Sequence, residues 1–174
     1  VTCMLIASKY EEIYAPQVDE FCYITDNTYT REDVLLMERT VLNALDFELT
    51  QPTTRLFLRQ YFQAAECDAK VEFYAYFLAE LALLEYKLLK FSPSIVAAAA
   101  LSLAMVTFGD SVWSPILVHQ TGICEEHFSE CVSELRRCHS SVGKSSLRAA
   151  LEKYSHAKFH CVSLIEPKGP VSCS

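Results

Sequence analysis

The chain begins with an almost unbroken run of apolar side chains, from Val1 through Ala7, before its first charge at Lys9. At a helical period of 3.6 residues, such a run leaves no wide polar face. A helix of this kind is typical of the interior of a bundle. We therefore expect a central helix over residues 1–14, with other helices packed around it.

Two opposite charges stand among these apolar positions. Lys9 lies one helical turn after Leu5 and one turn before Ile13. Glu38 lies within the apolar stripe of a second expected helix, over residues 30–45. An unpaired charge in apolar surroundings costs several kcal/mol, so both side chains need partners. Two interpretations remain open: an ordinary salt bridge within the chain, or a contact with a second protein at the rim of a helical bundle.

The rest of the chain also follows a helical period, and no segment alternates with period two for long enough to form a strand. Thr30, Ser92-Pro93 and Ser114-Pro115 are typical helix starts, and Gly109-Asp110 is a helix end. The sequence therefore predicts an all-α fold. After the first helix, the predicted helices cover about residues 16–22, 30–45, 53–62, 68–85, 95–106, 115–122, 124–139 and 145–154.

Composition excludes several classes of protein. The apolar fraction of 51% excludes a disordered tail, and 174 residues suffice for one domain or two small ones. A net charge of −7 argues against a nucleic-acid surface. No apolar segment reaches the ~18–20 residues of a membrane span, and the first residues lack a secretory signal. The eight cysteines are therefore expected to be reduced thiols.

One group of residues combines metal-ligand types on an expected helix. Cys124, Cys131 and Cys138 recur every seven residues, with His127 nearby. Zinc sites usually take short Cys-x₂₋₄-Cys pairs, and the sequence has none. We therefore interpret the three cysteines as small core residues.

The sequence also lacks a nucleophile motif and a glycine-rich phosphate loop. We expect no catalytic residues, no metal and no cofactor.

An internal repeat divides the chain into two related parts. A shift of about 94 residues places Val1 over Ile95, and residues 23–29 over residues 117–123. Identity is low, so the correspondence is one of helix order and turn position. The second copy has two further helices ahead of its central helix, over about residues 53–90. We therefore expect about 40 residues of the first copy to precede Val1 in a longer protein.

Several segments resemble the cyclin family, and they are most similar to the mitotic A-type cyclins. These segments are ASKYEEIYAP, FCYITDNTYTREDVLLMERTVL, QPTTRLFLRQYF, LKFSPSIVAAAALSLA and KYSHAKFHCVSLIEP, and they span essentially the whole chain. The resemblance implies a tandem cyclin-box fold of two five-helix bundles, the first of them incomplete. It assigns residues 1–48 to the C-terminal part of the first box, 49–166 to the second box and 167–174 to a tail.

The resemblance also implies a binding site for a cyclin-dependent protein kinase. The corresponding positions in this chain are Lys9, Glu38, Tyr10, Glu12, Leu42 and Phe47. Glu12 lies at the border of the implied site. The implied protein is a regulatory subunit and not an enzyme. It forms a heterodimer with the kinase and stabilises the active placement of the kinase C-helix. The implied role is cell-cycle control at S phase and G2–M, in the nucleus and also in the cytoplasm. No nucleic-acid or membrane partner is expected.

The same tandem fold also serves another functional class. Transcription factors of the initiation-factor-B type bind DNA with it, and retinoblastoma-type pocket proteins bind peptides with it. The acidic balance of the chain weakens the DNA alternative. The segments around Lys9 and Glu38 favour a kinase partner over both. A cyclin-fold module that binds DNA or peptides is therefore the alternative function.

Overall fold

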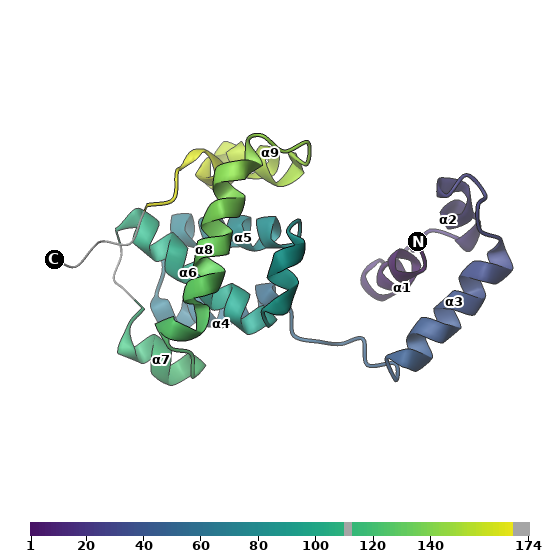
Figure 1. Cartoon of the computed structure of the whole chain (residues 1–174), viewed down its shortest axis with the longest axis horizontal. Helices are drawn as coiled ribbons and strands as arrows, with labels where there is room; N and C mark the ends of the chain where they lie inside the picture. Colours follow the sequence, from purple (N-terminus) through teal and green to yellow (C-terminus); the bar gives the residue numbers. More distant parts are fainter. Residues whose placement is uncertain (110–112, 169–174) are drawn as a thin grey trace. The chain divides into compact units, whose positions relative to one another are not determined.

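A computed structural model describes residues 1–109 and 113–168 (Figure 1). Asp110, which is expected to help end the alanine-rich helix, lies outside the described residues, as do residues 169–174 of the expected tail. The described residues form helices joined by turns, and none of them lies in a strand. The predicted all-α class is confirmed.

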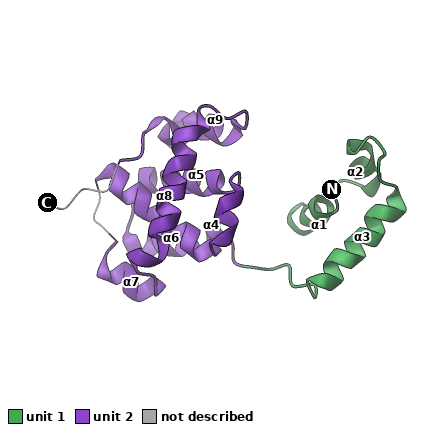
Figure 2. Cartoon of the chain, viewed as in Figure 1, with its two compact units in different colours: residues 1–51 green, residues 52–174 purple. Residues whose placement is uncertain are grey.

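The chain divides into two compact units, residues 1–51 and residues 52–174 (Figure 2). The first unit contains α1 (Thr2–Glu11), α2 (Val18–Ile24) and α3 (Arg31–Ala44). The second unit contains, in chain order, α4 (Thr54–Ala65), α5 (Ala69–Ala82), the 3₁₀ helix η1 (Tyr86–Lys90), α6 (Pro93–Phe108), α7 (Pro115–Thr121), α8 (Glu125–Val142), α9 (Ala149–Ser155), and the 3₁₀ helices η2 (Ala157–Phe159) and η3 (Val162–Leu164).

The helix order of the first unit recurs in the second. There, α6, α7 and α8 follow one another as a longer, a short and a longer helix, as α1, α2 and α3 do. The short helices α2 and α7 both have 7 residues. Two helices, α4 and α5, precede α6 within the second unit. The internal repeat is therefore visible as a shared order of helices.

The core of the second unit forms around α6. Residues Ala97–Ala100 are fully buried, and α4, α5 and α8 all pack against this helix. Small side chains allow these neighbours to approach closely while larger residues fill the space between them. Ser92 caps the helix by accepting a hydrogen bond from the Ile95 N–H at 3.4 Å. Gly109 ends it with a left-handed backbone, at a φ of 82°.

The core of the first unit is much smaller and consists of Leu5, Val18, Phe21, Cys22 and Val34. In α1, Leu5 and Ile6 are buried, whereas Met4 is 61% exposed. Within this unit only α2 and α3 pack against α1. Two helices thus pack against α1 in residues 1–51, and the arrangement of further helices around it stays a prediction.

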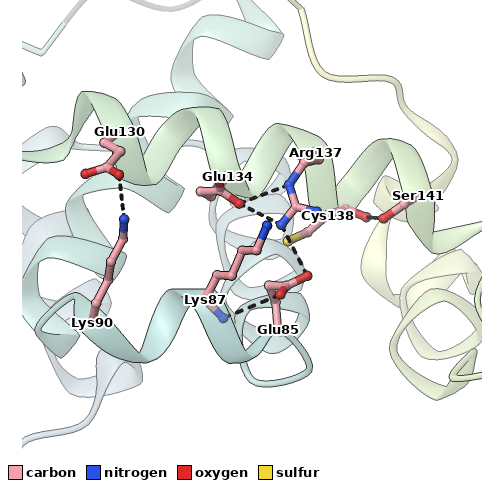
Figure 3. A network of polar contacts seen from close by, with 8 residues as sticks. All are labelled: Glu85, Lys87, Lys90, Glu130, Glu134, Arg137, Cys138 and Ser141. Atoms are coloured by element: carbon pink, nitrogen blue, oxygen red, sulfur yellow. Dashed lines mark hydrogen bonds and ion pairs between the residues drawn. The ribbon is translucent and has the colours of Figure 1, made fainter.

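The segment between α5 and α6 also differs from the prediction, which extended a single helix to Glu85. The α-helix ends at Ala82, and η1 follows, with Leu88 buried. Ion pairs hold this segment against α8 (Figure 3): Arg137–Glu85 at 3.3 Å and Lys90–Glu130. The 3₁₀ helix places Leu88 in the core of the second unit, although the apolar pattern alone would continue the α-helix.

The cysteines of α8 lie largely as expected. Cys131 and Cys138 are buried within the core, as predicted. The prediction is wrong for Cys124, which is exposed at the N-cap position of the helix. The position is exposed because the helix reaches the core only from Phe128 onward.

Candidate functional site

Lys9 and Glu38 form an ion pair between α1 and α3. The Lys9 Nζ donates to Glu38 Oε1 at 2.8 Å. The Glu38 side chain is only 14% exposed, whereas the Lys9 side chain is 49% exposed. An ammonium has three donors, so Lys9 can bind a further acceptor without releasing Glu38. The structure thus shows the salt bridge within the chain and leaves its cationic half accessible to another molecule.

The C-terminal end of α3 is a Schellman motif that fixes Leu42 and Phe47. The Phe47 N–H donates to the Leu42 carbonyl at 2.9 Å, and the Asp46 N–H donates to the Asn43 carbonyl at 3.1 Å. Asp46 and Phe47 both have a left-handed backbone, with φ of 48° and 59°. Aspartate tolerates this conformation, but it is unusual for an aromatic residue. The Phe47 side chain is 63% exposed. The motif therefore presents an aromatic ring at the surface.

Tyr10 lies in the last turn of α1 and is half exposed. Its hydroxyl forms a hydrogen bond with Thr50 Oγ1 at 2.6 Å. Glu12 caps the same helix, and its N–H donates to the Ser8 carbonyl at 2.9 Å. The Glu12 side chain is exposed, and its carboxylate has no ion-pair partner among the described residues. The end of α1 thus offers a cation, an aromatic ring and an anion to solvent.

The six residues predicted from the sequence come from two places, the end of α1 and the second half of α3 with its following turn. The structure brings Lys9 and Glu38 into direct contact and joins Tyr10 to the segment that follows Phe47. Among the described residues, no hydrogen bond or ion pair joins the Glu12 side chain to the other five. Thr50 belongs to this group through its bond to Tyr10, and the sequence analysis missed it. No spacing or periodicity in the sequence could have identified it, because Thr50 is a single hydroxyl residue in a linker.

Exposed apolar side chains accompany the ion pair. Met37 beside Glu38 is 51% exposed, and Leu45 near the end of α3 is 49% exposed. Aromatic and methionine side chains are enriched in protein–protein interfaces, where charge-assisted hydrogen bonds add specificity. The chemistry of this surface therefore suits recognition of another protein.

Outside this surface, the described residues include a buried thiol, Cys131. Burial raises the pKa of the Cys131 thiol to about 12, so this side chain stays protonated at neutral pH. Within residues 1–109 and 113–168, no three histidine, cysteine, aspartate or glutamate side chains gather as a metal site. In the same residues, no helix is both long enough and apolar enough to span a membrane.

Comparison with protein families accounts for both units. The N-terminal domain of cyclins matches residues 1–50, and the C-terminal domain of cyclins matches residues 52–168. The chain belongs to the cyclin family. Its all-α structure is the cyclin-box fold. Cyclins are regulatory subunits and not enzymes, in agreement with the expectation that the chain has no catalytic residues.

Curated relatives of the chain are A-type cyclins. The chain is 49% identical to cyclin-A1-2 of Oryza sativa subsp. japonica over 92% of its length. It is 47% identical to cyclin-A1-1 of Arabidopsis thaliana and 43% identical to cyclin-A2 of Gallus gallus, each over 94% of its length. The chain spans 36%, 37% and 42% of the lengths of these three cyclins, respectively.

Proposed function

We propose that the chain binds a cyclin-dependent protein kinase and activates it, as a regulatory subunit in cell-cycle control at S phase and G2–M. The observation that carries this proposal is the Lys9–Glu38 ion pair, 2.8 Å long, with a half-exposed cation. Exposed Tyr10 and Phe47 side chains belong to the same two helix ends. The similarity to A-type cyclins supports the same function.

Activation of such a kinase requires the glutamate of its C-helix to pair with the catalytic lysine. A regulatory subunit that packs against the C-helix stabilises this arrangement. In this proposal, Lys9 donates to kinase acceptors while Glu38 holds its ammonium in place. Tyr10, Leu42 and Phe47 provide the apolar area that excludes water around the charges, and Glu12 lies at the border of the contact. Excluding water strengthens the charge-assisted bonds.

Substitution of the ion pair tests the proposal, because its effects on stability and on binding should differ. In the free chain the pair is partly exposed, so Lys9→Met should lower the free energy of unfolding by about 1 kcal/mol or less. In the complex the same change leaves Glu38 buried without a partner, which should weaken binding by roughly 30-fold or more. Glu38→Gln should act in the same direction. Calorimetric titration of a purified cyclin-dependent kinase measures the affinity, and urea unfolding measures the stability.

Lys90→Met is the matched control, because it removes a lysine from an exposed ion pair of the second unit. This variant should bind the kinase as the unchanged chain does. If Lys9→Met and Glu38→Gln both bind with unchanged affinity, these residues are not the contact. Phosphorylation of a protein substrate, with and without the chain, tests activation separately.

We also propose that the protein acts in the nucleus, with a second population in the cytoplasm, as the resemblance to cyclins implies. Imaging of a fluorescent fusion tests this location.

A mobility-shift assay on duplex DNA tests the alternative function. Because the net charge is −7, we expect the chain to leave the mobility of the DNA unchanged.

A further inference from the structure

Residues 45–51, which follow α3 and include Phe47, are tied to α1 by one side-chain hydrogen bond. Residues 1–51 are all described, and among them the Tyr10–Thr50 bond at 2.6 Å is the one side-chain hydrogen bond that this segment makes. Its other hydrogen bonds join backbone groups close in sequence. For example, the Glu48 N–H donates to the Leu45 carbonyl at 2.8 Å. The tie to α1 is therefore the only one of these bonds that links the segment to a different helix.

The segment also holds an unfavourable backbone conformation. Asp46 and Phe47 are consecutive left-handed residues, and neither is glycine. Such a conformation persists only where the surroundings impose it. The Schellman bonds fix the first half of the turn, up to the Phe47 N–H. The Tyr10–Thr50 bond lies on the other side of Phe47 in the sequence, so the ring is held between two fixed points.

We propose that Thr50 is a positioning residue for kinase binding and that it acts through Tyr10. The Tyr10–Thr50 hydrogen bond, here called the clasp, keeps residues 47–50 next to the end of α1, where Lys9 also lies. Without the clasp, the segment can leave its left-handed conformation, and the kinase must order it again at a cost in affinity. This inference rests on the proposed function and adds to it a residue that need not touch the kinase.

The required group is the Thr50 hydroxyl, so isosteric and conservative variants separate the clasp from a general effect on folding. Thr50→Val keeps the shape of the side chain and removes the hydroxyl. It should weaken kinase binding by about five- to tenfold, the factor expected for one hydrogen bond. Thr50→Ser keeps the hydroxyl and should restore the affinity to within about twofold. Tyr10→Phe should cause a loss similar to that of Thr50→Val. The double variant Tyr10→Phe/Thr50→Val should lose no more than either single change.

Thr28→Val is the matched control, because the Thr28 hydroxyl also makes a 2.6 Å hydrogen bond, to the Thr25 carbonyl, in the turn between α2 and α3. It should leave kinase affinity unchanged.

Amide hydrogen exchange of the full chain adds a measurement that needs no kinase. Thr50→Val should speed exchange at Phe47 and Glu48 and leave the core amides of the second unit unchanged.

The outcomes distinguish this inference from the proposed function. Faster exchange, weaker binding and rescue by Thr50→Ser together support the clasp. Unchanged exchange in Thr50→Val overturns it. Faster exchange with unchanged affinity also overturns the positioning role, but the proposed function survives if Lys9→Met still weakens binding. Absence of kinase binding by the unchanged chain overturns both.

Discussion

His139 is a titratable side chain within the core of the second unit. It is 8% exposed, and its ring centroid lies 5.8 Å from that of Tyr74 and 5.4 Å from that of Phe77. Its Nε2 has no hydrogen-bond partner among the described residues. Burial lowers the pKa of His139, although the Glu166 carboxylate and a hydrogen bond with the Ile165 backbone partly oppose this shift. Burial thus favours the neutral imidazole of His139 in the folded chain.

The lowered pKa predicts that acid destabilises the second unit. Below the usual histidine pKa of 6.5 the unfolded chain binds a proton at this residue, and the folded chain resists it. The contribution to the free energy of unfolding is thus fully present above pH 6.5 and declines as the pH falls below that value. His139→Phe keeps an aromatic ring beside Tyr74 and Phe77 and should remove this part of the pH dependence. Urea unfolding at pH 7.5 and pH 5.5 measures it. If the free energy of unfolding changes equally with pH in the unchanged chain and in His139→Phe, the pH dependence belongs to other groups.

The residues of the candidate site could be predicted from the sequence only where a pattern marks them. Lys9 and Glu38 are visible because each charge interrupts an apolar stripe. The pattern requires a partner for each charge but does not identify it, so the contact between them had to come from the structure. Thr50 has no such mark. Its partner Tyr10 is 40 positions away, and their meeting depends on the tertiary fold.

Among the helices, α3 carries two of the six candidate contact residues, Glu38 and Leu42, and its start is fixed by a reciprocal cap. Thr30 Oγ1 accepts a hydrogen bond from the Asp33 N–H at 3.2 Å, and Asp33 Oδ2 accepts one from the Thr30 N–H at 3.0 Å. The bond from the Thr30 N–H, together with a 2.8 Å hydrogen bond that the Thr30 hydroxyl donates to Asp33 Oδ2, lowers the pKa of Asp33. The cap thus sets the first turn of the helix that carries Glu38.

Loss of this cap should weaken the first unit. Thr30→Ala removes the acceptor of the Asp33 N–H and should lower the free energy of unfolding of this unit by about 1 kcal/mol. The same substitution within the helix, Thr40→Ala, should instead raise stability slightly, because alanine has the higher helix propensity. Thermal unfolding followed by circular dichroism measures both. Equal effects of the two changes would argue against a role of the cap.

Helix starts were the most predictable part of the fold, because capping chemistry is local. Ser92-Pro93 and Ser114-Pro115 mark the starts of α6 and α7 in the structure as they do in the sequence. The final helix was less predictable, since it begins at Ala149 rather than at Ser145. η1 was missed because this segment packs and pairs with residues far along the chain, such as Glu130 and Arg137 on α8. The local pattern of apolar and polar residues cannot predict contacts between segments so far apart in the sequence.

At the scale of the whole molecule, the two units differ in the size of their cores. Among the described residues, the first unit has five clustered core residues and the second has thirty. A unit of about 50 residues with so small a core is marginally stable by itself.

We therefore predict two unfolding transitions, with the first unit unfolding at the lower temperature. Addition of a purified cyclin-dependent kinase should raise the lower transition more than the upper one, because the proposed contact residues all lie in the first unit. Differential scanning calorimetry measures both transitions. A single sharp transition above about 55 °C without kinase would contradict the prediction.

The placement of all six proposed contact residues in the unit with the smaller core has a consequence for how affinities are interpreted. Only molecules in which residues 1–51 are folded can present the ion pair and the aromatic rings together. The apparent affinity for a partner is then the intrinsic affinity multiplied by the folded fraction of that unit. Phe21 and Val34, buried away from any partner, would thus influence binding through that fraction. Affinity measurements alone would mistake such residues for contacts.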